Sequence, residues 1–313
     1  MKDIAIVAGS SSVAFASRVC SILGIELTKT NLGTFGNGEV FVEIDESVRD
    51  KDVFVFQSSS DTPNGHLMEL FLLLDALKRS SCYRVTTVMP NFPYARQDRK
   101  VRSRVPISAK LVANLITEAG TDRFLTAEFH SPQIAGFFDV PVDNLYSAPV
   151  FLNHIKENNP DNNICLVAPD AGSVKVAKMY SGRLECDVAM IYKNRSGPGK
   201  IKEMKLIGEV ADKNCIIVDD MADSCGTIAK ASNILMTNGA RSVRAYCTHA
   251  VLSGEAERNL HNSNIDKLYV SDTIVNPKTK YIQQIEILSI ADLFADAIKN
   301  INEENSMKEL FYY

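Results

Sequence analysis

The chain has 313 residues, of which 45% are hydrophobic and 23% charged, the proportions of an ordinary soluble globular protein. Its 34 basic and 38 acidic side chains give a formal net charge of −4, which argues against a general nucleic-acid coat or a polybasic membrane anchor. No apolar run approaches the ~18 residues that span a bilayer, so we expect no membrane segment. Asp3 is followed by only a short apolar stretch at 4–8, so we expect no signal peptide. The length favours two domains.

In the first half of the chain, short β-rich runs alternate with amphipathic segments. Leu67, Leu70, Leu74 and Leu77 fall on one helical stripe, and Pro106 stands where a helix would begin. The pattern predicts strands at 4–8, 40–44, 53–57, 85–89 and 123–127, and helices at 12–23, 67–78 and 107–118.

The alternation repeats in the second half. It predicts helices at 148–158, 173–180, 227–236 and 290–301, and strands at 164–168, 188–192, 215–218, 243–248 and 282–288. Strands that alternate with helices indicate an α/β fold of mostly parallel sheets flanked by helices. A boundary near residue 146 gives domains at 1–145 and 146–313, and ligands are expected at the carboxyl ends of the strands.

The strongest motif follows the predicted strand at 215–218. Two carboxylates end the apolar run, and a loop of small and hydroxyl residues leads into the next helix. Carboxylates accept hydrogen bonds from ribose hydroxyls, and backbone amides at a helix N-terminus attract a phosphate. We therefore expect a sugar phosphate here, with an acidic helix cap as the alternative. The candidate ligands are Asp219, Asp220, Asp223, Ser224, Cys225, Gly226 and Thr227.

A basic segment at 96–104 carries five cations against one acid. A predicted strand precedes it, and Pro90 and Pro93 stiffen the approach. These features favour nucleotide binding, with a solvated basic loop as the alternative.

Two smaller groups of residues have both a functional and a purely structural interpretation. Phe35, Asn37 and Glu39 suit stacking on a base and reading its edge, but the residues alone favour a glycine-containing β-turn. Strand alternation puts Glu128 and His130 on one face, where they can bind a divalent cation, although a lone pair of this kind is more often structural.

Two loops complete the candidate site. Asp170, Ala171, Gly172, Ser173 and Lys175 stand at a strand-to-helix turn, which suits either a pyrophosphate cradle or a plain helix cap. The segment 192–203 follows a strand and is rich in breakers, which predicts a mobile loop, with a solvated hairpin tip as the alternative.

Other patterns exclude rival chemistries. The seven cysteines are scattered without a C-x-x-C pair, so a zinc site or disulfide framework is not expected and a reducing, cytoplasmic compartment fits. The sequence has no G-x-x-x-x-G-K-[ST] and no G-x-G-x-x-G, which argues against a P-loop enzyme and against nicotinamide chemistry.

Several motifs together resemble the ribose-phosphate pyrophosphokinase (phosphoribosyl pyrophosphate synthetase) family. They occur in family order and spacing, at 35–39, 91–100, 106–114, 130–138, 169–172 and 215–227. The resemblance implies two similar domains of phosphoribosyltransferase-like fold. It also implies transfer of pyrophosphate from Mg-ATP to the 1-hydroxyl of ribose 5-phosphate, which gives phosphoribosyl pyrophosphate and AMP.

The resemblance also implies a role for each group of residues. Lys193 and Arg195 are the implied catalytic pair, and His130 and Asp170 the implied Mg²⁺ ligands. ATP is implied to bind at Phe35, Asn37, Glu39, Arg96 and Gln97, and ribose 5-phosphate at 219–227. The chain departs from the family pattern at Val101, Glu128, Ser173 and Val176.

Family members are homo-oligomers, hexamers built of dimers, with phosphate as activator and ADP as inhibitor at an inter-subunit site. The matching positions here are Ser47, Arg49, Ser81, Arg104, Ser306 and Phe311, and scattered surface polar residues are the alternative. We expect no nucleic-acid or membrane partner. A catalytically silent subunit of this family and a phosphoribosyltransferase stay open as alternatives.

Overall fold

The computed structural model describes residues 2–59, 61–197 and 200–311, and it describes no side chain from 193 to 203. The chain forms two compact units. Unit 1 comprises Met1–Tyr146, Asp272–Val275 and Ile290–Tyr313, and unit 2 comprises Ser147–Ser271 and Asn276–Ser289. The sequence predicted one boundary near residue 146, whereas the contacts return the last segment of the chain to the first unit.

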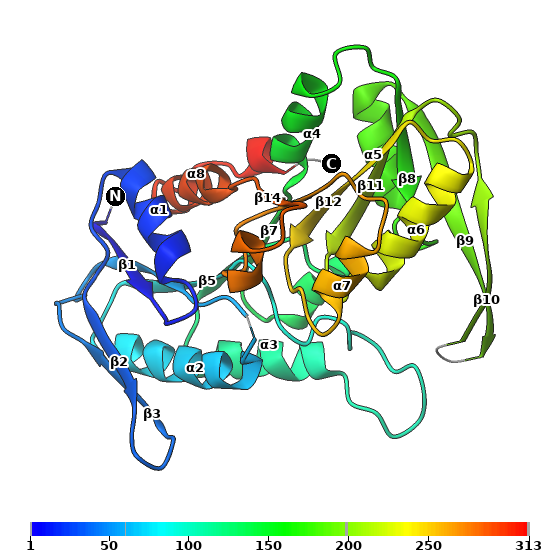
Figure 1. The fold of residues 1–313 in the computed structure, drawn as a ribbon. Helices are drawn as coiled ribbons and strands as arrows, with labels where there is room; N and C mark the ends of the chain where they lie inside the picture. The colour runs from blue at the N-terminus through cyan, green and yellow to red at the C-terminus, as the bar shows by residue number, and fades with distance from the viewer. Residues whose placement is uncertain (1, 60, 198–199, 312–313) are drawn as a thin grey trace. The chain divides into compact units, whose positions relative to one another are not determined.

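Unit 1 is built on a parallel sheet, which has five strands within the described residues, in the order β1-β4-β5-β6-β7. An antiparallel hairpin of β2 and β3 projects past α2 and is drawn in blue (Figure 1). The elements are β1 (Ile4–Ala8), α1 (Val13–Leu23), β2 (Thr30–Thr34), β3 (Val40–Ile44), β4 (Asp52–Phe56), α2 (Pro63–Arg79), β5 (Arg84–Met89), α3 (Ser108–Ala119), β6 (Arg123–Ala127), the 3₁₀ helix η1 (Pro132–Phe137), β7 (Val142–Leu145), α8 (Ala291–Asn302) and η3 (Lys308–Leu310).

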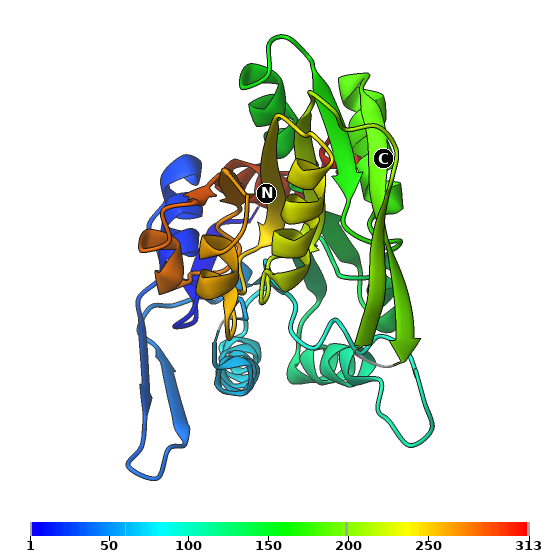
Figure 2. The same cartoon turned by 45° about the vertical axis from the view of Figure 1, so that its right-hand side comes forward.

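Unit 2 has a larger sheet. In the described part of the chain it contains seven strands, in the order β10-β9-β8-β11-β12-β13-β14. All neighbours pair in parallel except β9 and β10, which form the long hairpin seen in Figure 2. The elements are α4 (Ala148–Glu157), β8 (Ile164–Ala168), α5 (Val174–Leu184), β9 (Asp187–Gly197), β10 (Lys200–Ile207), β11 (Asn214–Met221), α6 (Gly226–Thr237), β12 (Ser242–His249), α7 (Ala256–His261), β13 (Lys267–Val270), η2 (Pro277–Lys280) and β14 (Ile285–Ile287).

The two units repeat one order of elements. Each runs strand, helix, hairpin, strand, helix, strand, helix, strand, 3₁₀ helix, strand, and the core strand order β1-β4-β5-β6-β7 matches β8-β11-β12-β13-β14. A helix follows each copy, α4 after the first and α8 after the second, but α4 belongs to unit 2 and packs on α5, whereas α8 belongs to unit 1 and packs on α1. The two units therefore exchange their last helices.

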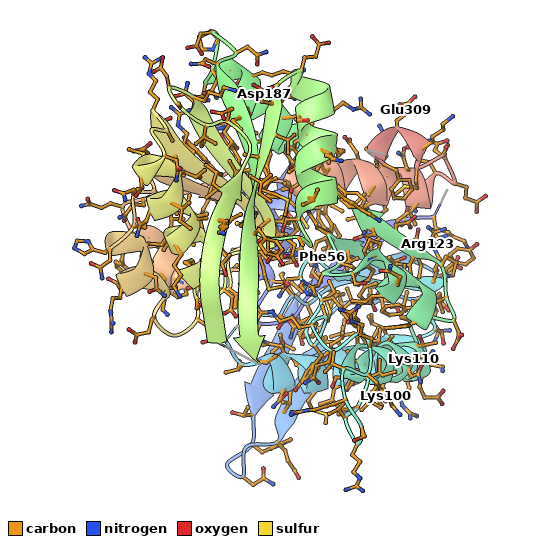
Figure 3. All side chains as sticks on the ribbon, turned by 90° about the vertical axis from the view of Figure 1, so that its right-hand side faces the viewer. Phe56, Lys100, Lys110, Arg123, Asp187 and Glu309 are labelled. Carbon is orange, nitrogen blue, oxygen red and sulfur yellow. The ribbon has the colours of Figure 1, made fainter. Side chains whose placement is uncertain are left out.

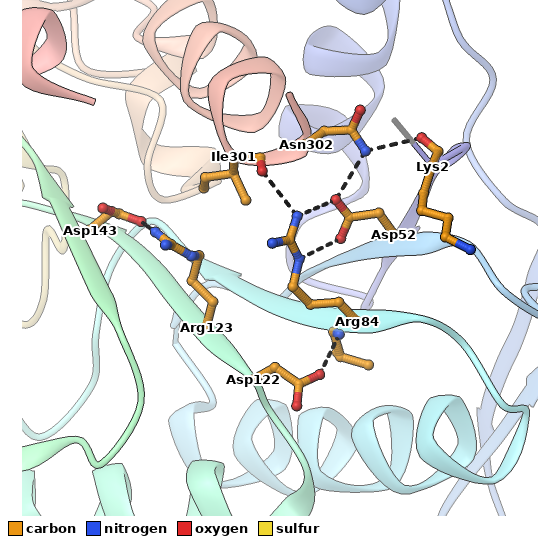
Figure 4. A network of polar contacts seen from close by, with 9 residues as sticks. Lys2, Asp52, Arg84, Asp122, Arg123, Asp143, Ile301 and Asn302 are labelled. Atoms are coloured by element: carbon orange, nitrogen blue, oxygen red, sulfur yellow. Dashed lines mark hydrogen bonds and ion pairs between the residues drawn. The ribbon is translucent and has the colours of Figure 1, made fainter. Parts of the chain in front are cut away.

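Polar contacts fasten α8 to the sheet of unit 1 (Figure 4). Arg84 on β5 donates to both oxygens of Asp52 on β4, at 2.9 and 2.5 Å, and to the carbonyl oxygen of Ile301 at 3.0 Å. Asn302 at the end of α8 donates to Asp52 Oδ2 at 3.0 Å and to the carbonyl oxygen of Lys2 at 3.0 Å. Asp52 is buried, so these donors compensate its loss of water.

An aromatic cluster in unit 1 fixes the loops that follow β5 and β6. Phe92 follows β5, Phe129 follows β6, and both rings contact the ring of Phe124 within the sheet, with centroids 5.8 and 6.2 Å away. Phe138, at the end of η1, stacks on Phe124 at 4.4 Å. All four rings are buried, so the beginnings of these loops are anchored in the core.

The predicted α/β architecture of mostly parallel sheets is confirmed, and each predicted strand and helix has its counterpart within a few residues. The predictions missed β2, β7, β10, β13 and the short helix α7. Within the residues described, no helix is long and apolar enough to span a membrane.

Candidate functional site

The acidic motif of unit 2 lies at the carboxyl edge of the sheet, as predicted. β11 carries Asp219 and Asp220 near its end, and Cys225 stands at the N-cap of α6 with a left-handed φ of 57°. The loop between them is tied down by its neighbours: Ser253 donates to Asp223, and Asn259 Nδ2 donates to the carbonyl oxygen of Ser224 at 2.8 Å. These contacts hold the loop against the N-terminus of α6, where amides can bind an anion.

The carboxylates of Asp170, Asp219 and Asp220 lie close together at this edge, because β8 and β11 are neighbouring parallel strands. Burial, together with repulsion from Asp220 and Asp170, raises the pKa of Asp219 to about 7. Carboxylates grouped in this way accept hydrogen bonds from hydroxyl groups, which suits a sugar.

The predicted pyrophosphate turn lies between β8 and α5. Asp170 Oδ1 accepts hydrogen bonds from the backbone N–H of Gly172 at 3.0 Å and of Ser173 at 3.4 Å. Ser173, the N-cap residue of α5, is buried, whereas Lys175 in the first helical turn is exposed. Asp170 therefore closes the turn that precedes α5, and Ser173 makes no side-chain cap hydrogen bond to the helix. Both sequence interpretations of this turn stay predictions, and the pyrophosphate role is a proposal.

The segment 192–203 is not the loop that the sequence predicted. β9 continues to Gly197 and pairs with β10, so Lys193 stands opposite Met204 and Arg195 opposite Ile201. β9 ends at Gly197 and β10 begins at Lys200, and residues 198–199 lie outside the described residues. The hairpin alternative is thus the correct one, and the side chains of Lys193 and Arg195 lie outside those described.

The basic segment of unit 1 is an irregular loop between β5 and α3, as predicted. Its five basic side chains are exposed, and Figure 3 labels Lys100 on the loop and Lys110 on α3. The loop is anchored at its base, where Gln97 Oε1 accepts from Ser108 Oγ and the Gln97 carbonyl accepts from the Ala109 N–H at 3.2 Å. Arg96 and Gln97 are therefore presented to solvent at the carboxyl edge of the unit 1 sheet.

Residues 35–39 form the tip of the β2–β3 hairpin. The Phe35 N–H donates to the Glu39 carbonyl at 2.8 Å, and Asn37 Oδ1 accepts from the Glu39 N–H at 3.1 Å. Gly38 has a φ of 88°, a conformation that glycine adopts freely. The turn favoured by the residues is confirmed, and Phe35 is 56% exposed at its tip, beside Phe41.

The prediction that Glu128 and His130 share a strand face does not hold. β6 ends at Ala127, and Glu128 takes a φ of 45°, so the alternation of side chains stops before both residues. Glu128 is half-buried and His130 exposed. Both still lie at the carboxyl edge of the unit 1 sheet, directly after β6.

The predicted regulatory residues all belong to unit 1. The segments of Arg49 and Ser81 meet through the Asp50 N–H, which donates to the Ser81 carbonyl at 3.0 Å. Arg104 lies on the basic loop, and Ser306, whose Oγ accepts from the Lys308 N–H at 3.2 Å, follows α8. The regulatory assignment stays a prediction.

Sequence reasoning missed residues that hold the site without being part of a motif. Ser253 and Asn259 support the 219–227 loop from α7 and the turn before it, and α7 is too short for a periodicity signal. Ser173 was recognised as part of the turn, but its contact with Asp219 was not foreseen.

Parallel sheets with acidic and basic loops at their carboxyl edges define an α/β enzyme of phosphorylated substrates. Two family models match the chain: the N-terminal domain of ribose phosphate pyrophosphokinase, over residues 4–120, and the phosphoribosyl synthetase-associated domain, over 197–312. The chain belongs to the ribose-phosphate pyrophosphokinase family.

Individual relatives agree with this assignment along the whole chain. A ribose-phosphate pyrophosphokinase of Rhizobium meliloti is 46% identical over 97% of this chain and 98% of its own length. The Clostridium tetani protein of the same name is 44% identical over 99% of this chain and 98% of its own length. A phosphoribosylpyrophosphate synthetase from Mycobacterium smegmatis, solved by crystallography, superposes with a TM-score of 0.92 at 39% identity and covers 97% of this chain and 100% of its own.

Proposed function

We propose that this enzyme transfers an intact pyrophosphoryl group from Mg-ATP to the 1-hydroxyl of ribose 5-phosphate, producing phosphoribosyl pyrophosphate and AMP. The observation that carries the proposal is the acidic loop at the carboxyl edge of unit 2, in a chain whose relatives are named for this reaction along their full length. The same names argue against a phosphoribosyltransferase, which would consume the product.

Ribose 5-phosphate is proposed to bind at residues 219–227. Asp219 and Asp220 accept hydrogen bonds from the ribose hydroxyls, while the amides and hydroxyls of residues 223–227 bind the 5-phosphate at the N-terminus of α6. The fixed loop supports this role, because a pre-organised anion site needs little rearrangement when the ligand binds.

ATP is proposed to bind through residues of unit 1. The exposed ring of Phe35 offers a stacking face for adenine, and Asn37 and Glu39 offer groups that read its edge. Arg96 and Gln97 lie on the exposed basic loop, where a triphosphate gains several charge-assisted contacts.

Magnesium fits this donor set as a substrate-borne ion. Mg²⁺ keeps several waters and is usually held by one or two carboxylates together with substrate phosphates. The described residues contain no group of three or more His, Cys, Asp or Glu side chains that could hold a metal. His130 and Asp170 are the proposed protein ligands.

Catalysis is proposed to consist of positioning and charge neutralisation. The ribose 1-oxygen attacks the β-phosphorus in line, and AMP leaves without a covalent enzyme intermediate. Lys193 and Arg195 are proposed to stabilise the negative charge of the phosphoryl oxygens in the transition state. The backbone of both residues belongs to β9, which pairs with β10.

The assembly and its environment are proposed on separate grounds. Met68 and Leu72 on α2 and Leu111 and Leu115 on α3 are exposed apolar pairs on two packed helices, which supports a homo-oligomer, with a hexamer built of dimers as the family form. Activation by phosphate and inhibition by ADP are proposed at the regulatory residues named above. All seven cysteines are free thiols, which supports a reducing, cytoplasmic compartment.

An AMP-release assay tests the proposed reaction. We expect AMP and phosphoribosyl pyrophosphate to form in equal amounts from ATP, Mg²⁺ and ribose 5-phosphate. A folded protein that produces no AMP would be the silent subunit instead, and consumption of phosphoribosyl pyrophosphate with a free base would indicate a phosphoribosyltransferase. Repeating the assay with and without phosphate and ADP tests the regulatory proposal.

A further inference from the structure

Ser173 lies between Asp170, in the turn after β8, and Asp219, near the end of β11. Its side chain is 7% exposed, and its Oγ lies 3.1 Å from Asp219 Oδ1 and 3.4 Å from Asp170 Oδ1. A hydroxyl has one proton to donate, and the shorter distance favours Asp219 as its acceptor. The Asp220 N–H donates to the same Oδ1 at 3.1 Å. Two donors thus fix one oxygen of Asp219, and no hydrogen bond from the described residues reaches the other, Oδ2.

We propose that Ser173 is a positioning residue for ribose 5-phosphate. Its hydroxyl holds Asp219 by Oδ1, so that Oδ2 keeps one orientation and accepts a ribose hydroxyl. The inference rests on the proposed function, because it takes Asp219 as a ligand of the sugar. Without the hydroxyl, repulsion from Asp170 and Asp220 would turn the Asp219 carboxylate away from this orientation.

Unit 1 contains the same hydrogen bond in a purely structural setting. Gln57 stands two residues after Val55, which pairs with β1, as Asp219 stands two residues after Ile217, which pairs with β8. Gln57 Oε1 accepts from Ser11 Oγ at 2.6 Å.

The acceptor in unit 1 is fully used within the protein. Gln57 is completely buried, and its Nε2 donates to Glu69 Oε1 at 2.6 Å. The buried amide therefore has no polar group left for a substrate, whereas Asp219 is a half-buried carboxylate with Oδ2 available. Ser11 is for this reason the matched control for Ser173.

Binding and turnover of four proteins test the role of Ser173: wild type, Ser173→Ala, Ser173→Thr and Ser11→Ala. Titration calorimetry with ribose 5-phosphate in the presence of Mg²⁺ measures binding without turnover. We expect Ser173→Ala to raise the Kd about tenfold, because a hydrogen bond to a charged group orients the ligand. Ser173→Thr keeps the hydroxyl and restores binding to about twice the wild-type Kd or less. The KM for ribose 5-phosphate rises with the Kd, while kcat and the KM for ATP stay unchanged.

Ser11→Ala lowers the thermal midpoint without changing the Kd for ribose 5-phosphate. Unchanged binding by Ser173→Ala, or equal weakening by Ser11→Ala, overturns the positioning role. A wild type that binds ribose 5-phosphate but makes no AMP refutes the proposed reaction and leaves the role of Ser173 intact, whereas a wild type without ribose 5-phosphate binding refutes both. Should Ser173→Ala unfold, as judged by circular dichroism, Ser173→Gly removes the same hydroxyl with no added volume.

Discussion

Glu128 has a backbone conformation that is unfavourable for a glutamate. Its φ of 45° is left-handed, and such a conformation costs an L-residue roughly 1–2 kcal/mol unless a short polar side chain relieves it. The backbone is nevertheless fixed, because the Glu128 N–H donates to the Leu145 carbonyl at 2.8 Å. Aspartate, which has the same charge, is enriched in this region of φ and ψ, whereas glutamate is not.

Glu128→Asp is therefore expected to stabilise the protein. We expect the free energy of unfolding to rise by about 0.5 kcal/mol, because aspartate tolerates the left-handed conformation better. Urea denaturation measures the change. Glu185 has a φ of 52° after α5 and is exposed, so Glu185→Asp serves as a control with the same expected sign. A stabilised Glu185→Asp beside a destabilised Glu128→Asp would show that the longer side chain of Glu128 makes a contact that aspartate cannot.

Lys193→Ala is expected to lower kcat about a hundredfold or more, which is the usual effect of removing one group that stabilises transition-state charge. The Kd for ribose 5-phosphate should change little, because residues 219–227 are proposed to hold the sugar. Single-turnover kinetics and titration calorimetry separate the two quantities. Lys205→Ala, on β10 of the same hairpin, should keep both values. Weak ribose 5-phosphate binding with normal turnover would contradict the assigned role.

At the scale of elements, α8 is attached to the unit 1 sheet through the buried carboxylate of Asp52, which accepts hydrogen bonds from Arg84 and Asn302. Asp52→Asn leaves Arg84 with a neutral partner, and we expect the free energy of unfolding to fall by about 2 kcal/mol, less than for a fully buried pair because Arg84 is partly exposed. Asp50→Asn removes the exposed ion pair with Lys2 and should cost about 0.5 kcal/mol or less. Equal losses in the two variants would show that the burial of Asp52 adds nothing to stability.

The junction of α4 with β12 and β13 predicts a dependence of stability on pH. His154 Nδ1 on α4 lies 2.9 Å from Tyr246 Oη, and the His154 ring packs against that of Tyr269 at a tilt, with centroids 4.4 Å apart. Burial lowers the pKa of His154 below its ordinary 6.5, against the raising effect of Glu286 and Glu157 and with a smaller lowering effect of Arg244.

Below pH 6.5 the unfolded chain therefore binds a proton at His154 that the folded chain does not. The free energy of unfolding is therefore not reduced by His154 above pH 6.5, and it falls as the pH drops from 6.5 toward the lowered pKa of His154 in the folded state. Unfolding in urea at pH 8, 6.5 and 5 measures this loss, and His154→Gln should show a smaller one. A variant with the same pH dependence as the wild type would contradict the assignment to His154.

The elements themselves were predictable where sequence pattern and burial agree. The stripe of Leu67, Leu70, Leu74 and Leu77 becomes the buried face of α2. β2 was missed because Gly33 interrupts it and its side chains are half-exposed, and β10 because it borders a segment dominated by breakers. In the candidate site the motif residues were predicted, but the hydrogen bond between Ser173 and Asp219 was not, because it joins residues 46 positions apart in the chain.

At the scale of the whole molecule, the repeat explains both the similarity of the units and their different tasks. Each copy places loops at the carboxyl ends of matching strands, but the position of Asp219 in unit 2 is taken by Gln57 in unit 1, whose amide is satisfied by Ser11 and Glu69. The exchange of α4 and α8 could not be read from the sequence, because periodicity shows which face of a helix is apolar and not which sheet that face covers.

The helix exchange predicts which strands lose protection from hydrogen exchange when a core residue of α4 or α8 is mutated. Phe294 on α8 is completely buried, and its ring meets that of Phe15 on α1 at 5.2 Å. Phe294→Ala should cost about 3–5 kcal/mol, and hydrogen exchange should quicken in β1 and β4 of unit 1. Phe151 on α4 is 1% exposed, with its ring 5.5 Å from Tyr246 on β12. Phe151→Ala should instead quicken exchange in β8 and β12 of unit 2.

Hydrogen exchange is thus expected to quicken in different units in the two variants, whichever elements are adjacent to the mutated helix in the sequence. β14 and η2 immediately precede α8 in sequence but belong to unit 2, so their exchange should stay protected in Phe294→Ala. Exchange that quickens in β14 and not in β1 would mean that the chain divides near residue 146, as its sequence alone suggests. Protection that is lost in β1 and β4 alone would tie the stability of unit 1 to the last helix of the chain.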